Sequence, residues 1–193
     1  MKLGLVAYGD ESIQRECTPQ RYLLGATVYA SESDPTFLLR QAKPSGARKL
    51  HWYDLDARRQ AVSLAVVSQI AQQTTVVVAM PLEGVRLERA RRKALEALVR
   101  TLIDMGIGKL VLESRNAVHD KRDRELLVSM RRKGEATEFD LEHVPGESEP
   151  LLWVPDQILG AYGEMITKGI NRRWAESWEI IDRTLNVCEV PAR

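Results

Sequence analysis

No uninterrupted run of eighteen apolar residues occurs in the sequence, so no segment has the length that a membrane-spanning helix needs. The N-terminus also lacks the apolar stretch and the cleavage site of a signal peptide. Cysteine is scarce, because Cys17 and Cys188 are the only two, and they form no metal-binding motif. Together these absences predict a reduced, cytoplasmic protein that does not associate with membranes.

The motifs of several enzyme classes are missing as well. The sequence has no Gly-rich phosphate-binding loop, no nucleophile elbow and no Cys/His zinc motif. The net charge is only +1, so a surface that binds nucleic acid would have to be local. Hydrophobic residues make up 44% of the 193 residues, which is enough for a sizeable core and excludes a disordered chain. The length fits one domain, alone or with a modest extension.

The stretch from Leu3 to Ser12 organises the rest of the predicted fold. It opens as a short strand through Tyr8 with apolar residues on both faces, which is typical of a central strand. Asp10 and Glu11 follow where this strand is expected to end at the surface. Because side chains alternate along a strand, the two acids should point to opposite faces, with only one in line with Tyr8. Taken alone, both acids are also explained by a solvated turn.

The rest of the chain alternates between strand and helix patterns. A second strand at 21–30 should pair with the first in a hairpin across the polar linker 12–20. Further strands are expected at 74–80, 109–113 and 136–143, and helices at 34–39, 57–73 (capped by Asp56), 85–105, 120–133 and 155–168. This order predicts an α/β fold with a mixed five-stranded sheet and helices on both faces. The tail at 171–193 has no assigned structure.

Five short motifs follow one another between residues 3 and 168. They are Tyr8-Gly-Asp-Glu-Ser12, Tyr22-Leu-Leu-Gly-Ala26, Lys49-Leu-His-Trp52, Leu110-Val-Leu-Glu113 and Val154-Pro-Asp-Gln-Ile-Leu-Gly-Ala161. In this order they resemble a large bacterial family, known only as a domain of unknown function, whose members are similar to ribonuclease H. The chain departs from the family pattern at Ile13, Glu113 and Pro155. The resemblance implies a ribonuclease-H-like domain at 3–170 with a helical insertion at about 34–73, followed by a C-terminal extension at 171–193.

This resemblance also implies a metal-dependent chemistry. Ribonuclease-H-like nucleases hold two divalent cations between carboxylates that come from separate elements. Mg²⁺ or Mn²⁺ would suit such a site, because hard cations prefer carboxylate oxygens. The resemblance assigns Asp10, Glu113 and Asp156 as catalytic acids and metal ligands. Glu11 is either a fourth ligand or merely solvated.

The last predicted helix carries a feature that would bring two of these acids together. Asp156, Gly160 and Gly163 share one helix face, so small residues would let the helix approach the sheet and place Asp156 near Asp10. On its own, Asp156 is better explained as an acid that the helix dipole favours in a first turn.

Two further residues are candidates for contacts with a substrate. His51 could contact phosphate or assist proton transfer, or it could be a structural histidine. Lys93 belongs to a basic run at 86–93 that could meet a phosphate backbone or simply form a solvated helix face. The leading hypothesis is metal-dependent hydrolysis of phosphodiester bonds in RNA or DNA. The alternative is a non-catalytic module of the same fold that binds nucleic acid or a protein. The sequence does not indicate an oligomeric state.

Overall fold

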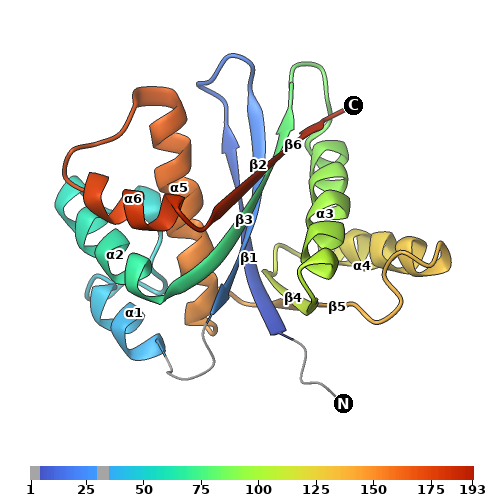
Figure 1. The fold of residues 1–193 in the computed structure, drawn as a ribbon, viewed down its shortest axis with the longest axis horizontal. Coiled ribbons are helices and arrows are strands. Elements are labelled where there is room, and N and C mark those ends of the chain that lie inside the picture. Colours follow the sequence, from blue (N-terminus) through green and yellow to red (C-terminus); the bar gives the residue numbers. More distant parts are fainter. Residues whose placement is uncertain (1–4, 30–34) are drawn as a thin grey trace.

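A computed structural model describes residues 5–29 and 35–193 as a six-stranded mixed sheet with helices packed on both faces (Figure 1). The strands are β1 (Leu5–Gln14), β2 (Arg21–Tyr29), β3 (Ala71–Met80), β4 (Ile107–Glu113), β5 (Asp140–Val144) and β6 (Leu185–Pro191). The helices are α1 (Thr36–Ala42), α2 (Ala57–Ile70), α3 (Leu87–Asp104), α4 (Ala117–Arg132), α5 (Trp153–Lys168) and α6 (Ala175–Asp182), with single turns η1 (Trp52–Asp54) and η2 (Pro150–Leu152). Within the two described ranges, no helix combines the length and apolar character that crossing a membrane requires.

The strand order is β5-β4-β1-β2-β3-β6, and β1 lies inside the sheet as its two apolar faces predicted. The strands β1, β2 and β3 pair antiparallel, while β4 runs parallel to β1 and β5 parallel to β4. The predicted hairpin of the first two strands is therefore confirmed, as are the mixed character of the sheet and the helices on both of its faces.

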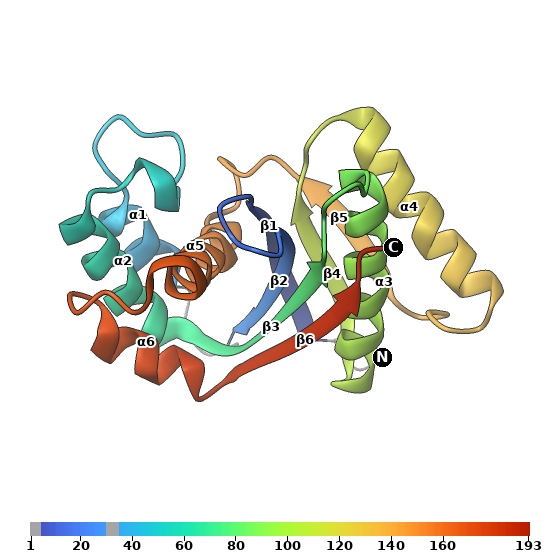
Figure 2. The same cartoon turned by 90° about the horizontal axis from the view of Figure 1, so that it is seen from above.

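The prediction of five strands is wrong, because residues 185–191 of the unassigned tail form a sixth. This strand, β6, pairs parallel with β3 at one edge of the sheet (Figures 1 and 2). Its residues are half-buried or exposed, so the sequence lacks the continuous apolar run that marks the inner strands. The helix α6 precedes it and is anchored by the buried side chains Trp178 and Ile181.

Several element boundaries also differ from prediction. The helix α4 begins at Ala117 rather than at residue 120, because Asn116 caps it, and β5 begins at Asp140 rather than at residue 136, because its pairing with β4 starts there. The helix expected at 57–73 ends at Ile70, and β3 begins immediately afterwards because Ala71 and Gln73 pair with β2. The first strand does not end at the two acids but continues to Gln14, since its pairing with β2 extends that far. The predicted cap is confirmed, because the Asp56 carboxylate accepts hydrogen bonds from two backbone N–H groups of the first turn of α2.

Parts of three predictions lie outside the described residues. These parts are the start of the first strand at residues 3 and 4, the end of the second strand at residue 30, and the start of the helical insertion at residue 34.

Two hydrophobic cores cover the two faces of the sheet. The helices α3 and α4 lie on one face, whereas α1, α2, α5 and α6 lie on the other (Figure 2). Neighbouring residues of a strand serve different cores, so that Leu24 packs in the α3 core and Leu23 in the α5 core. This two-sided burial explains why the inner strands consist of uninterrupted apolar residues.

The helix α5 makes two close approaches through glycine. A Cβ atom at Gly160 would overlap the indole of Trp52, which is fully buried, and one at Gly163 would overlap the side-chain amide of Gln14 on β1. The predicted approach to the sheet therefore occurs at Gly163, whereas Gly160 accommodates η1. Together the two contacts hold the middle of α5 in place.

We predict that Gly160→Ala lowers the free energy of unfolding by roughly 1–2 kcal/mol. Overpacking against a rigid buried ring costs about 1–3 kcal/mol, and the higher helix propensity of alanine returns at most about 1 kcal/mol. Gly163→Ala, the matched variant in the same helix, should change stability by no more than about 0.5 kcal/mol, because the Gln14 side chain can move aside. Urea unfolding of the two variants tests this difference, and equal losses would contradict it.

Candidate acidic site

The site begins where β1 loses one of its two neighbours. Pairing between β1 and β4 ends at Gly9 and Leu112, but β1 continues along β2 for five more residues. Asp10 is the first residue beyond this point, and Glu113 follows Leu112 at the end of β4. The sheet therefore opens beside Asp10, and the two carboxylates come from adjacent strands.

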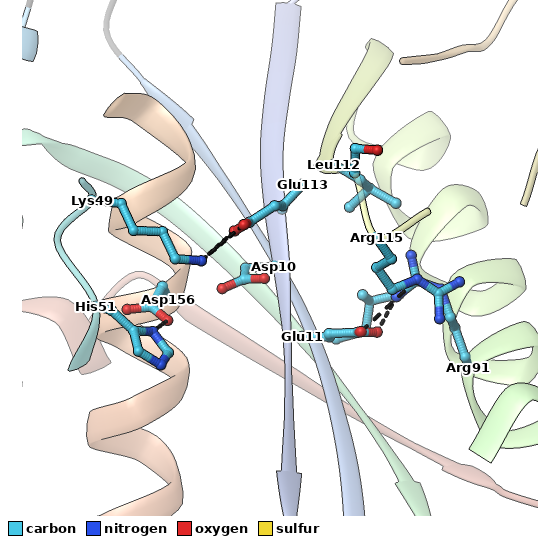
Figure 3. Close-up of a pocket in the computed structure, with 12 residues that line it drawn as sticks. Asp10, Glu11, Lys49, His51, Arg91, Leu112, Glu113, Arg115 and Asp156 are labelled. Atoms are coloured by element: carbon cyan, nitrogen blue, oxygen red, sulfur yellow. Dashed lines mark hydrogen bonds and ion pairs between the residues drawn. The ribbon is translucent and has the colours of Figure 1, made fainter. Parts of the chain in front are cut away.

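Asp10, Glu113 and Asp156 line one pocket, with a cavity volume of about 320 Å³ (Figure 3). They come from β1, β4 and the first turn of α5, so the structure brings together the three acids that the sequence singled out. His51 and Lys49 line the same side of the pocket from the segment before η1.

Asp156 is held rigidly by three hydrogen-bond donors. His51 Nδ1 lies 2.7 Å from Oδ1, while the Trp52 backbone N–H and the Gln157 side-chain amide each donate to Oδ2 at 2.8 Å. Because Trp52 packs against Gly160 in the same helix, the η1 segment and α5 fix each other. His51 therefore has a structural partner in the site, because its contact with Asp156 orients that carboxylate.

Glu113 is held by a residue that the sequence interpretation missed. The Lys49 ammonium group lies 2.8 Å from both carboxylate oxygens of Glu113. A Cβ atom at Gly146 would overlap this carboxylate, so the glycine leaves the space that Glu113 occupies. Lys49 lies within a motif noted in the sequence, two residues before His51. In an extended segment this spacing points both side chains to the same side, which could have marked Lys49 as well.

Electrostatics in the pocket disfavour the charge of Asp10. Burial raises the pKa of Asp10 well above its usual range, and the nearby carboxylates of Asp156 and Glu113 raise it further. Burial lowers the pKa of Lys49, but the hydrogen bond and charge of Glu113 outweigh this effect, so the net pKa is raised. The hydrogen bond to Asp156 raises the pKa of His51. The pocket therefore binds positive charge more readily than negative charge.

Glu11 lines the same pocket as the other three acids, but its side chain points away from them. Alternation along β1 directs Asp10 to the α5 face, on the side of Tyr8, and Glu11 to the α3 face, as predicted for neighbouring residues. There Glu11 forms an ion pair with Arg91 and accepts a hydrogen bond from Tyr22. Glu11 is thus neither a solvated acid nor directed at Asp10; its carboxylate is used by a buried arginine.

Arg91 joins Glu11 to a second buried acid. The Arg91 side chain is 4% exposed, and its Nη2 donates to Asp123 at 2.7 Å. Burial raises the pKa of Asp123, but hydrogen bonds from His143 and Arg91 outweigh it and lower the pKa to about 2. Lys93 lies on the same helix α3, is exposed, and does not line the acidic pocket. Its predicted contact with phosphate would therefore lie away from Asp10.

The donor set suits a hard cation with few protein ligands. Among residues 5–29 and 35–193, no three His, Cys, Asp or Glu side chains are placed to hold one metal ion together. Mg²⁺, however, commonly binds through one or two carboxylates and retains water ligands. Asp10 accepts a hydrogen bond from the Glu11 backbone N–H, and no side chain in the described part donates to it. Its oxygens, together with Asp156 Oδ1, which accepts only one of the three hydrogen bonds to Asp156, would suit one hydrated divalent cation.

Comparisons of this chain with protein-family models, with curated proteins and with solved structures found no match. The resemblance drawn from the five sequence motifs therefore stays a prediction, and the chemistry of the site has to be inferred from its own geometry.

We predict that Asp10→Asn raises the melting temperature at pH 7–8 in the presence of a chelator. The folded-state pKa of Asp10 is raised, so its ionisation opposes folding at any pH above the unfolded-state pKa of about 3.9. The gain from Asp10→Asn should therefore be complete above the folded-state pKa and should disappear as the pH falls towards 4. Thermal unfolding between pH 4 and pH 8 measures this trend.

Glu11→Gln is the matched control, because it neutralises the adjacent acid of the same strand. It should lower the melting temperature at pH 7–8, since it leaves the buried Arg91 without one of its partners. If Asp10→Asn is the less stable protein instead, Asp10 has a structural role and the electrostatic account of the pocket is wrong.

Proposed function

We propose that this protein hydrolyses phosphodiester bonds in RNA or DNA with the help of Mg²⁺ or Mn²⁺. The observation that carries the proposal is the pocket in which Asp10, Glu113 and Asp156 converge from three elements, with the pKa of Asp10 raised by burial and by the other two acids. Titratable groups with strongly shifted pKa values gather at functional sites more often than elsewhere.

The arrangement of the strands supports a ribonuclease-H-like interpretation of the fold. The first three strands pair antiparallel and β4 lies beside β1, so the ends of β1 and β4 can offer acids to one site. The edge strand β6 is an addition to the five strands expected for that architecture. Fold alone does not determine activity, so the proposal depends on the pocket.

Each residue of the pocket has a role in this proposal. Asp10 and Asp156 would hold the cation, and His51 keeps the Asp156 carboxylate oriented through its 2.7 Å contact. When bound, the cation supplies a water of lowered pKa and neutralises charge at the phosphorus centre. The Lys49 ammonium group compensates the charge of Glu113 and lies where a phosphate oxygen could also meet it. Glu11 belongs to the ion-pair network of Arg91 and has no part in the chemistry.

One observation favours the alternative, a module that binds nucleic acid without cutting it. Lys49 already satisfies both oxygens of Glu113, so part of the acidic charge is neutralised within the protein itself. A pocket of this kind could bind a partner through Lys49 and His51 with no cation present. Cleavage assays separate the two functions.

We predict that the purified protein cuts RNA, DNA or a hybrid of the two only when Mg²⁺ or Mn²⁺ is present, and that a chelator abolishes cutting. Asp10→Asn and Asp156→Asn should each lower the rate at least about 100-fold, because each removes a charged cation ligand. Asp104→Asn, which changes an exposed acid at the end of α3, is the matched control and should retain the full rate. Lys93→Ala should spare the rate of cutting, since Lys93 does not line the pocket.

Two results would contradict the nuclease proposal. If every substrate remains intact with both metals but some bind with an affinity that falls as salt is raised, the binding module replaces the nuclease. Cutting that survives in Asp10→Asn would place the active site elsewhere.

A further inference from the structure

The pocket contains a fixed cation of its own, the ammonium group of Lys49. It lies 2.8 Å from each of the two carboxylate oxygens of Glu113, so the ion pair involves both oxygens equally. The side chains of Lys49 and Glu113 are 32% and 26% exposed, so neither is freely solvated. This pair is therefore a built part of the site, unlike the neighbouring Arg48–Glu147 pair, in which both side chains are mostly exposed.

The segment that carries Lys49 is fixed by the core. Leu50 and Trp52, on either side of His51, are fully buried, and the Trp52 backbone N–H is bonded to Asp156. Lys49 therefore extends from an anchored segment across the pocket towards Glu113, above Asp10 (Figure 3). The glycine at position 146 leaves room for the Glu113 carboxylate to meet it.

Charge in the pocket limits how many divalent ions it can take. With Asp10, Glu113 and Asp156 ionised and Lys49 protonated, the α5 side of the pocket carries two negative charges when His51 is neutral. On the other side, Glu11 and Asp123 pair with Arg91 and Arg115, so that side adds no net charge. One divalent ion neutralises the two negative charges, whereas two ions would leave an excess of positive charge in a partly desolvated site. The two-cation site implied by the sequence resemblance needs acidic charge that Lys49 has already neutralised.

The acceptor positions lead to the same conclusion. No side chain of the described residues donates to Asp10, and Asp156 faces it across the pocket, so these two carboxylates can share an ion. Asp156 Oδ1 accepts one hydrogen bond, from His51, and keeps a second lone pair for an ion. Both Glu113 oxygens instead face the positive charge of Lys49, which repels a second cation. A second ion between Asp10 and Glu113 would have to displace the ammonium group.

We propose that the pocket takes a single divalent cation, held by Asp10 and Asp156, and that the Lys49 ammonium group stands at Glu113 in place of a second one. This inference rests on the proposed function and specifies the number of ions that the site uses. Lys49 is a positioning residue, because it does not contact the bound cation and instead neutralises Glu113, which could otherwise bind a second one.

Isothermal titration calorimetry with Mn²⁺ alone tests the inference on the full chain. The unmodified protein should bind one ion, and Lys49→Met, which keeps the length of the side chain but removes its charge, should bind two. Two ions bridged by one carboxylate lie about 3.5–4 Å apart, so the electron paramagnetic resonance spectrum of Lys49→Met should show coupled Mn²⁺ ions that the unmodified protein lacks. Combining Lys49→Met with Glu113→Gln should return the number to one.

Arg48→Met is the matched control, because it removes a neighbouring charge that is 86% exposed, and it should still bind one ion. Two ions in the unmodified protein, or one ion in both it and Lys49→Met, would overturn this inference and leave the proposed function standing. No binding of Mn²⁺ to either protein would overturn both. If Lys49→Met fails to fold, Lys49→Gln replaces it, and the count in the unmodified protein still decides between one ion and two.

Discussion

Repulsion between three carboxylates that share one pocket is the constraint on which the site depends. Asp10 is half-buried beside the carboxylates of Glu113 and Asp156, so its ionised form is unfavourable. The acids stay close together, and hydrogen-bond donors around them offset the repulsion. Lys49 binds Glu113, and His51 with the Trp52 backbone binds Asp156, which leaves Asp10 as the acid without a side-chain donor.

The positions of these donors follow from packing. The α5 helix reaches the sheet through Gly163 and accommodates Trp52 at Gly160, and this contact aligns η1 with the first turn of α5. Asp156 and His51 meet as a result, although they are separated by more than one hundred residues in the sequence. The geometry of the acidic site is thus a consequence of how closely one helix can approach its neighbours.

Neighbouring acids of β1 show how strand alternation divides chemistry between the two faces of a sheet. Asp10 faces α5, where burial and the nearby carboxylates of Asp156 and Glu113 raise its pKa. Glu11 faces α3, where Arg91 and Tyr22 bind it. The same Arg91 binds Asp123, so this face holds a neutralised network and the other holds unbalanced negative charge. The proposed cation site therefore lies on the α5 face only.

Much of this architecture could be predicted from the sequence, because the inner strands are apolar on both faces and the helices have clear periodicity. The convergence of Asp10, Glu113 and Asp156 was also predicted, since each follows or begins a recognisable element. The edge strand β6 was missed because its half-exposed residues have no strong pattern. The ion pair of Glu11 with Arg91 and that of Lys49 with Glu113 could not be found, because both join residues more than sixty positions apart through side chains alone.

Anomalous diffraction from crystals soaked in Mn²⁺ would test the central claim most directly, because it locates a cation independently of any activity. The account predicts one anomalous peak in the pocket, within coordination distance of Asp10 and Asp156, with Lys49 still bound to Glu113. The absence of a peak beside Asp10 at millimolar Mn²⁺, or a peak only at other acids of the surface, would contradict the proposal that this pocket is a cation site.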